Sequence, residues 1–478
     1  MRTLLASIGL VLLFPALFLA QSDFALDHRP LAFTHVSVID GTGTPAQPDM
    51  TVLITGNRIT AIGKTGTVAI PRDARATDAR GQFMIPGLWD MHQHTFMRKN
   101  KVLPLISLWG NIINGVTGVR DMGDQGLPDD FGDLPMVQDF AWRQAIQAGA
   151  VVGPRLVLAG AILEGPPSPR KGWPELRTEA EARQEVMFLK KFGVDFVKVH
   201  DSLPREAYFG LADESKKQGL VFAGHVPNSI SVGEASDAGQ KSQEHLLGIL
   251  VACSTDEPRL AKAVAERGMT ANAQALVDTF SPEKARALYA RFVKNDTYVL
   301  PSFLREFGGL YRRSMTDPRL AYATPALRAE MEAQARNFRE QNVAANGVIR
   351  DAHYRVVREM QQAGVKLLAG TDGRLFGFDL HDELQELVKA GLTPMQALQT
   401  ATRNAADYLG TLASMGTVET GKLADLVLLA ANPIESIANT TKIRTVVVNG
   451  RLLDRPALDR LEAQMKDAAN PKTPPARD

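Results

Sequence analysis

Two histidines one residue apart, His92 and His94, close an apolar run that begins at Met84. On a β-strand, residues i and i+2 point to the same face, so both imidazoles could bind one metal ion. Asp90 would share that face of the strand. A pair of histidines in a loop is the alternative interpretation, because the Pro-Gly pair that precedes them indicates only a turn.

Further side chains suited to metal binding or proton transfer follow at the ends of later apolar segments. They are Lys198, His200, His225, His245 and Asp372. The gap from Lys198 to His225 and the gap from His225 to His245 each fit one compact β–α unit, so these side chains could converge. The single cysteine, Cys253, excludes intramolecular disulfides and multi-cysteine metal sites. The ligands of any metal must therefore be nitrogen and oxygen atoms.

Composition describes an ordinary globular chain. Of 478 residues, 45% are hydrophobic and 22% are charged, which is typical of a folded protein with a large core. Lys and Arg number 54 against 53 Asp and Glu, so the formal net charge is +1. Without a basic field, nucleic acid is not an expected partner. We expect a small molecule or a short peptide as the substrate and leave a homo-oligomer open.

The N-terminus has the form of a secretory signal. A charged start, Met1-Arg2-Thr3, precedes an apolar run from Leu4 to Ala20. Residues 1–25 are therefore predicted to direct export to the periplasm or the exterior. Phe18 fits the small-residue cleavage rule poorly, so an uncleaved anchor that holds the protein to a membrane is the alternative.

Short strands separated by tight turns occur near both ends of the chain. The segments 33–39, 51–55 and 58–62 alternate apolar and polar residues around Asp-Gly and Gly-Asn turns. The segments 424–429 and 443–450 show a similar strand-like pattern. We predict a small β-sandwich domain from residues 26–85 and 413–455. Residues 456–478 are predicted to form a helix and a disordered tail, because the end is rich in Pro and charge.

The insert between these ends, residues 86–412, alternates strand-like and helical segments. Capping signals such as Thr178 with Glu181 and Thr393 with Pro394 mark helix starts. Eight strands alternating with helices predict an α/β fold of the (β/α)8 TIM-barrel type, whose catalytic groups lie at the carboxyl ends of the strands. The predicted strands are Met84–His94, Gly115–Asp121, Arg155–Ala159, Asp195–His200, Val221–His225, Ser242–His245, Tyr298–Phe303 and Val365–Asp372.

The order of motifs resembles the amidohydrolase superfamily, in its imidazolonepropionase-like or metal-dependent dipeptidase-like branch. The motifs are Val-Ile-Asp-Gly-Thr-Gly (38–43), Pro-Gly-Leu-Trp-Asp-Met-His-Gln-His (86–94), Gly-Val-Thr-Gly-Val-Arg-Asp (115–121), Phe-Val-Lys-Val (196–199), Gly-His-Val (224–226), Gln-Glu-His (243–245), Ala-Gly-Thr-Asp (369–372) and Gly-Lys-Leu-Ala-Asp-Leu-Val-Leu (421–428). The resemblance implies that His92 and His94 bind one metal ion and that His225 and His245 bind a second. It also implies that Lys198, carboxylated by carbon dioxide, bridges the two ions, and that Asp372 is both a metal ligand and the catalytic acid and base.

Physical chemistry supports these roles. A lysine buried inside a barrel has a lowered pKa, and its neutral amine can react with carbon dioxide. Imidazole and oxygen ligands favour Zn²⁺ among the divalent ions. Two such ions can activate a bound water as hydroxide and polarise a carbonyl. Asp372 could then pass a proton to the leaving nitrogen. An aldolase-type Schiff base at Lys198 is the alternative, but it would leave the histidines unexplained.

The predicted reaction is hydrolysis of an amide bond. Deaminases of the superfamily generally place a glutamate within a few residues of the fifth-strand histidine, whereas His225 is followed by Val-Pro-Asn-Ser-Ile. Similar members include dipeptidases and N-acyl amino acid hydrolases, although a Gly-Gly-His segment that some of them carry is absent after Ala161. Hydrolysis of a lactone or cyclic amide, and a silent member that only binds small molecules, are the alternatives.

Three residues are candidates for substrate binding. His200 shares the inward face with Lys198, and either a substrate contact or a structural role fits it. Arg170 and Lys171 follow the third predicted strand and could bind a substrate carboxylate. His381 is expected to have a structural role at a helix start.

Overall fold

The computed structural model describes residues 29–96, 103–124, 126, 135–306, 317–340 and 343–471. The predicted signal or anchor at 1–25 and the end of the predicted tail lie outside these ranges. Within them, every helix is too short or too polar to cross a membrane.

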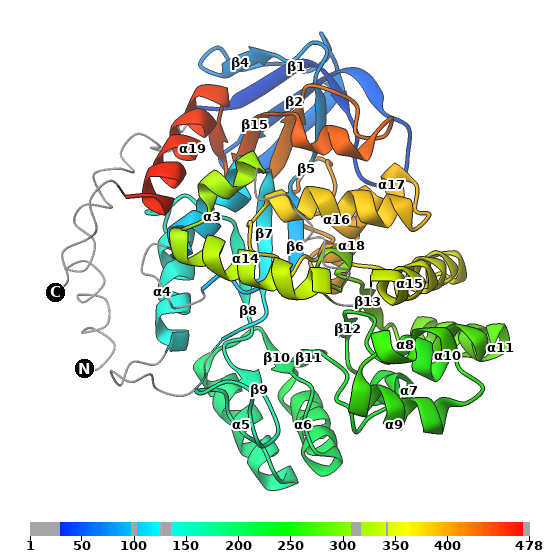
Figure 1. Ribbon diagram of the computed structural model, residues 1–478. Helices are drawn as coiled ribbons and strands as arrows, with labels where there is room; N and C mark the ends of the chain where they lie inside the picture. The colour runs from blue at the N-terminus through cyan, green and yellow to red at the C-terminus, as the bar shows by residue number, and fades with distance from the viewer. Residues whose placement is uncertain are drawn as a thin grey trace, which may run out of the picture.

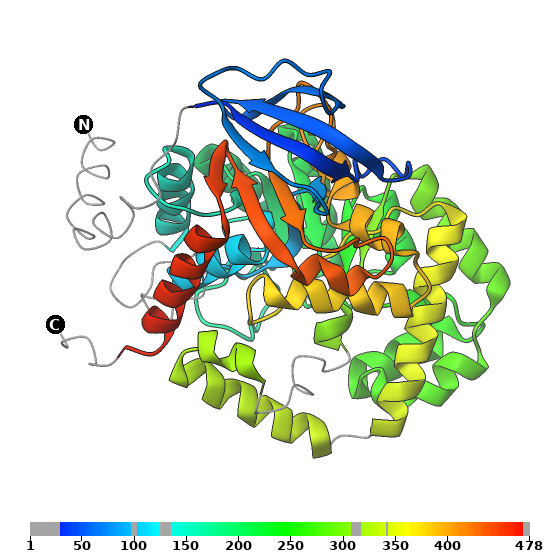
Figure 2. The same cartoon turned by 90° about the horizontal axis from the view of Figure 1, so that it is seen from above.

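Strands from the two ends of the chain form one eight-stranded sheet (Figures 1 and 2). It runs in the order β16-β15-β14-β5-β1-β2-β3, and β4 pairs with β1. The two ends meet where β5 pairs with β14 in antiparallel register, Ile85 opposite Val427. The N-terminal strands are β1 Leu31–Val38, β2 Gln47–Thr55, β3 Arg58–Lys64, β4 Arg75–Asp78 and β5 Phe83–Pro86, and the C-terminal ones are β14 Leu426–Leu429, β15 Ile443–Val448 and β16 Arg451–Leu453. The β-sandwich and the domain boundaries stay predictions.

Parallel strands of the insert form the scaffold of the site. A three-stranded sheet, β6-β7-β8, and a five-stranded sheet, β13-β12-β11-β10-β9, lie beneath the terminal sheet in Figure 1. A backbone hydrogen bond of 2.9 Å from Asp195 N to Leu158 O joins them. The strands are β6 Leu88–Gln93, β7 Val116–Asp121, β8 Arg155–Leu158, β9 Ile162–Leu163, β10 Phe196–Val199, β11 Val221–Gly224, β12 Ser242–Glu244 and β13 Tyr298–Leu300.

The last predicted strand, 365–372, is less regular than expected. Leu367 makes a single parallel bridge to Val299, yet the backbone hydrogen-bonds on both sides: Val299 N to Lys366 O at 3.0 Å and Met91 N to Ala369 O at 2.9 Å. This segment therefore connects β13 to β6. Asp372 has a φ of 45°, which turns the chain out of an extended conformation and ends the pairing.

Helices follow the strands and cover the outside, as a TIM-barrel-type α/β fold requires. Both predicted caps are present: Thr178 accepts from Glu181 N and Thr393 from Gln396 N. Ser281 caps α11 in the same way, accepting from Lys284 N. The C-terminal helix α19 packs against α3. The helices are α3 Leu103–Ile113, α4 Pro135–Gln147, α5 Glu179–Phe192, α6 Arg205–Gln218, α7 Val232–Asp237, α8 Ile249–Ala252, α9 Glu257–Arg267, α10 Ala273–Asp278, α11 Pro282–Lys294, α12 Phe303–Glu306, α14 Pro325–Glu340, α15 Val343–Ala363, α16 Phe378–Lys389, α17 Pro394–Thr400, α18 Arg403–Tyr408 and α19 Arg455–Ala469, with 3₁₀ turns η2 Thr270–Asn272, η3 Pro318–Tyr322 and η4 Ile437–Thr441.

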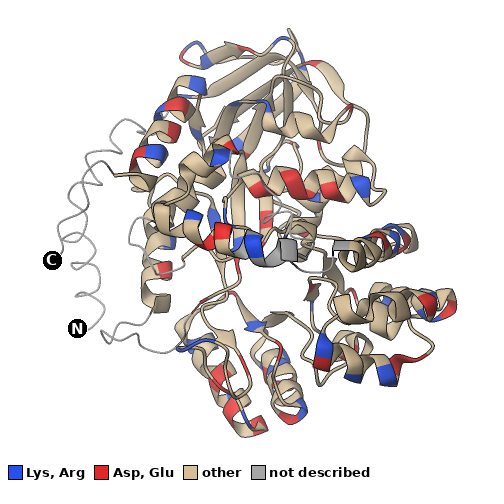
Figure 3. Cartoon of the chain, viewed as in Figure 1, with Lys and Arg blue, Asp and Glu red and all other residues tan. Residues whose placement is uncertain are grey.

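Charges of both signs are interspersed over the helices in Figure 3. This distribution accompanies the near-zero net charge of the chain. In that view the outer helices present mixed charge rather than a field of one sign.

Candidate metal centre

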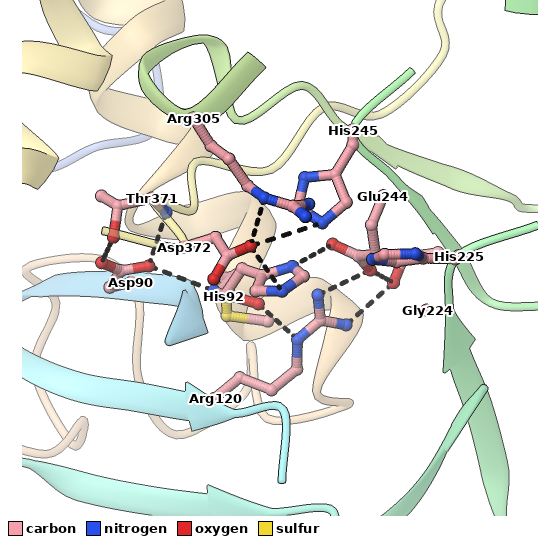
Figure 4. Close-up of polar contacts among 12 residues, drawn as sticks. Asp90, His92, Arg120, Gly224, His225, Glu244, His245, Arg305, Thr371 and Asp372 are labelled. Atoms are coloured by element: carbon pink, nitrogen blue, oxygen red, sulfur yellow. Dashed lines mark hydrogen bonds and ion pairs between the residues drawn. The ribbon is translucent and has the colours of Figure 1, made fainter. Parts of the chain in front are cut away.

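The imidazoles of His92 and His94 lie beside the carboxylate of Asp372. Figure 4 shows His92 and Asp372. His94 Nε2 is 3.7 Å from Asp372 Oδ1, and His92 Nε2 is 4.0 Å from Oδ2. One ligand atom from each of the three residues falls within 4.8 Å of the others, a spacing that could hold a metal ion. Gly370 permits the approach, since a Cβ there would lie 2.7 Å from His92 N.

The second predicted pair, His225 and His245, adjoins the first. Their ring centroids are 4.8 Å apart, and the His245 ring is 4.6 Å from that of His92. His245 Nε2 lies 3.8 Å from Asp372 Oδ2. Four imidazoles, from β6, β11 and β12 or the residues that follow them, therefore form one cluster, in which His92, His225 and His245 are buried and His94 is partly exposed.

Lys198 lies on β10 next to this cluster, in register with Ala223 of β11. Its side chain is buried, and Nζ has no hydrogen-bond partner among the described residues. Burial lowers the pKa of Lys198 to about 8. Gly224 leaves room for the lysine, because a Cβ there would lie 2.9 Å from Lys198 Cδ.

The charge states of these side chains suit the binding of a metal ion. Burial lowers the pKa of His94 to about 4 and those of His92, His225 and His245 well below the ordinary value. All four imidazoles are thus neutral near pH 7, which is the form that binds metals. Burial would raise the pKa of Asp372, but Arg305 and the neighbouring imidazoles outweigh it and hold that pKa well below its usual range.

A buried ion pair orients His92. Glu244 Oε2 lies 3.0 Å from His92 Nδ1, and Arg120 Nη2 donates to Glu244 Oε1 at 2.9 Å. Arg120 also donates to Ser242 Oγ and to the Met91 carbonyl, at 2.8 and 2.6 Å. The contact of Glu244 with Nδ1 leaves His92 Nε2 facing the site. Arg120 and Glu244 lie inside the motifs at 115–121 and 243–245, which predicted a role for neither.

Two other histidines are held in the same way. His94 Nδ1 donates to the Gly123 carbonyl at 2.7 Å, and His225 Nδ1 lies 2.6 Å from Asp201 Oδ1. Asp201 was missed because nothing in its sequence context points to a neighbouring strand. These contacts leave the Nε2 atoms available to a metal.

Asp90, which the strand alternation places on the face of His92 and His94, hydrogen-bonds to His92 N and to Thr371. Its Oδ1 accepts from His92 N at 3.1 Å and from Thr371 N at 3.0 Å, and its Oδ2 accepts from Thr371 Oγ1 at 2.8 Å. The register of β6 against β7 shifts on both sides of Asp90, which breaks the simple two-residue period. Asp90 thus ties β6 to the segment that carries Asp372.

The predicted substrate-binding residues lie beside Trp173. His200 Nδ1 lies 2.6 Å from Glu164 Oε2, and the His200 ring is 4.9 Å from the Trp173 ring and 4.2 Å from the His225 ring. His200, His225 and Asp201 form a second group with metal-ligand spacing. Arg170 lies 5.8 Å from the Trp173 ring, and Arg170 and Lys171 line a depression of about 990 Å³ with it. His381 contacts Thr440 Oγ1 at 2.9 Å and so links α16 to η4.

The profile of the Amidohydrolase family matches residues 83–453, which include the strands of the insert and the whole cluster. This chain belongs to the Amidohydrolase family. The superfamily that the motifs resembled is therefore confirmed.

Members of this family are similar to the chain over most of its length. An ochratoxinase from Aspergillus niger is 23% identical over 460 residues, 84% of this chain and 81% of the relative. A bottromycin amidohydrolase superposes with a TM-score of 0.74 at 24% identity, covering 97% of this chain and 95% of its own. A Xaa-Pro dipeptidase with methionine bound in its active site gives a TM-score of 0.64 at 22% identity, covering 89% and 100%.

Proposed function

We propose that this protein is a binuclear metal-dependent hydrolase of amide bonds in peptide-like molecules or N-acyl amino acids. One observation carries the proposal: four neutral imidazoles, a buried lysine and a carboxylate converge at the strand ends of the insert. The names of an ochratoxinase, a bottromycin amidohydrolase and a dipeptidase among the similar proteins favour a carbon–nitrogen bond.

The donor set fits two divalent ions. Its nitrogen and oxygen ligands favour zinc. His92, His94 and Asp372 would hold the first ion, and His225 and His245 the second. Lys198, carboxylated by carbon dioxide, would supply an anionic bridge, and its unpartnered Nζ suits this role. Bound here, the ions would supply Lewis acidity toward water and the substrate carbonyl.

The side chains of the protein would then direct the proton and hold the geometry. Asp372 is positioned to accept a proton from water and to pass it to the leaving nitrogen. Glu244, Gly123 and Asp201 each fix one imidazole through its Nδ1 atom. A dipeptidase activity is the narrower form of the proposal.

Two further features belong to the proposal. The (β/α)8 barrel would carry a β-sandwich formed by the terminal strands. The N-terminal segment would place the enzyme in the periplasm or outside the cell, or hold it there by an anchor.

The test is release of free amino acid from a pool of dipeptides and N-acyl amino acids, read by mass spectrometry. Zinc-loaded wild-type protein is compared with the Asp372→Asn variant, which keeps the shape of the side chain but not its charge. Release that disappears in the variant supports the proposal. No release from any member of the pool contradicts it, and lactones and cyclic amides would then be tried.

A further inference from the structure

Arg305 contacts the carboxylate that the proposed reaction uses (Figure 4). It lies on α12, directly after β13, and its Nε is 2.8 Å from Asp372 Oδ2. Arg305 has 36% of its side chain exposed, against 0% for His92 and His245. The guanidinium is therefore accessible to solvent, and thus to a substrate, while these two imidazoles are not.

The positive charge of Arg305 affects the pKa values of most residues of the site. Besides its effect on Asp372, it lowers the pKa values of His245, His225 and Lys198, after the larger effect of burial. Arg374 adds a second positive charge that acts on Asp372 and His94. Two cations thus act on Asp372, and one of them, Arg305, contacts its carboxylate.

The backbone of α12 is fixed by a buried acid. Glu383 on α16 accepts from Phe303 N at 2.9 Å and from Leu304 N at 3.0 Å. Glu383 is 0% exposed. These two bonds fix the backbone just before Arg305 and so the position from which its side chain extends. Glu383 therefore acts as a positioning residue.

We propose that Arg305 binds the α-carboxylate of the amino acid that leaves. Arg305 would give up its ion pair with Asp372 when the substrate binds. This inference rests on the proposed function. Asp372 is the group that would hand a proton to the leaving nitrogen, and Arg305 touches the same group. In an α-amino acid a single carbon separates nitrogen from carboxylate, so a ligand of Asp372 and Arg305 together has this spacing. A guanidinium fork binds a carboxylate through two parallel hydrogen bonds.

The substrate class follows from this assignment. The molecule would carry a free carboxylate next to the scissile amide, as N-acyl amino acids and the carboxyl ends of peptides do. Substrates whose carboxyl end is blocked, and lactones, would bind poorly. Arg305 thereby takes the role that the sequence analysis gave to Arg170 and Lys171, which line the depression beside Trp173.

The experiment uses two matched pools, N-acetyl-L-amino acids and the same compounds with C-terminal carboxamides. Both are offered to zinc-loaded wild type, Arg305→Gln and Arg305→Lys, with hydrolysis and retention on ultrafiltration each read by mass spectrometry. We expect Arg305→Gln to lose about 10- to 100-fold in kcat/KM and in retention for the acids, and little for the carboxamides. Arg305→Lys keeps the charge without the fork and should retain part of the preference.

Controls separate this inference from the proposed function. Arg259→Gln removes another arginine that is paired with an aspartate, Asp256, on exposed α9 and should behave as wild type. Retention of acids that depends on Arg305, without hydrolysis, would support the inference and contradict the proposed function. Equal loss for both pools, retention of neither pool by wild type, or relaxed preference in Arg170→Gln instead would overturn the inference.

Discussion

Nδ1 of His92 lies 3.0 Å from Oε2 of Glu244, and both side chains are fully buried. Arg120, equally buried, neutralises the carboxylate from the other side. A carboxylate behind an imidazole fixes the ring and increases its basicity toward a metal. The positions of Glu244 and Arg120 thus connect the interior of the fold to the proposed ligand.

Glu244→Gln should weaken metal binding by about 10- to 100-fold, because His92 loses its charged partner. It should also lower the free energy of unfolding by about 3–5 kcal/mol, because the charge of Arg120 is left uncompensated. A chelator competition measures the first effect and urea unfolding the second. The double variant Glu244→Gln/Arg120→Met should recover stability but not metal affinity, and recovery of both would refute the role of Glu244.

Gly224→Ala should destabilise the protein by about 1–3 kcal/mol through crowding, in addition to the cost of a positive φ. The new Cβ would lie 2.2 Å from the Val199 carbonyl oxygen, with the backbone at a φ of 134°. Gly239→Ala is the matched control, since it too has a positive φ, 89°, but nothing lies within 4 Å of its Cβ. Urea unfolding of both variants checks this; equal losses would show that conformation, not contact with β10, is responsible.

Stability should depend on pH through Glu383. Burial raises its pKa to about 8, although the amides of Leu304 and Phe303 act in the opposite direction. The unfolded chain releases this proton near pH 4.5, so the contribution is complete below that pH and falls as pH rises toward about 8. The slope is about 1.4 kcal/mol per pH unit for one proton. Unfolding of wild type and Glu383→Gln between pH 5 and 8 gives the difference, and parallel curves would contradict the raised pKa.

Carboxylation of Lys198 predicts a carbamate signal. With ¹³C-bicarbonate and zinc, the wild-type protein should show a carbamate resonance that Lys198→Arg lacks, because the pKa of arginine is too high for a neutral nitrogen. A resonance retained in that variant would assign the carbamate to another amine. Absence of the signal in wild type would leave Lys198 as a simple amine and contradict the bridge.

The sequence predicted which side chains converge better than it predicted the residues that hold them in place. His92, His94, His225, His245 and Asp372 come at strand ends, and parallel strands bring their ends together, so order along the chain was enough. Glu244 and Asp201 were missed because each acts on an imidazole from another strand or loop, a relation that no local pattern records. The hydrogen bonds of Asp90 to Thr371 could not be predicted, because the two residues lie far apart in the sequence and the register of β6 shifts around Asp90.

The terminal sheet could likewise be predicted from its hairpins, since Gly56 adopts the positive φ that its turn requires. The last strand of the insert could not. Its apolar run suggests an ordinary strand, whereas the chain turns at Asp372, where φ is 45°. This turn presents the carboxylate to His94 and His245.

The most direct measurement is an anomalous difference map at the zinc edge from crystals grown with zinc and bicarbonate. The proposed function predicts two peaks, one among His92, His94 and Asp372 and one between His225 and His245, with Lys198 linking them. A peak only among His200, Asp201 and His225, the other group with metal-ligand spacing, would contradict it. So would crystals in which the cluster around Asp372 binds no zinc.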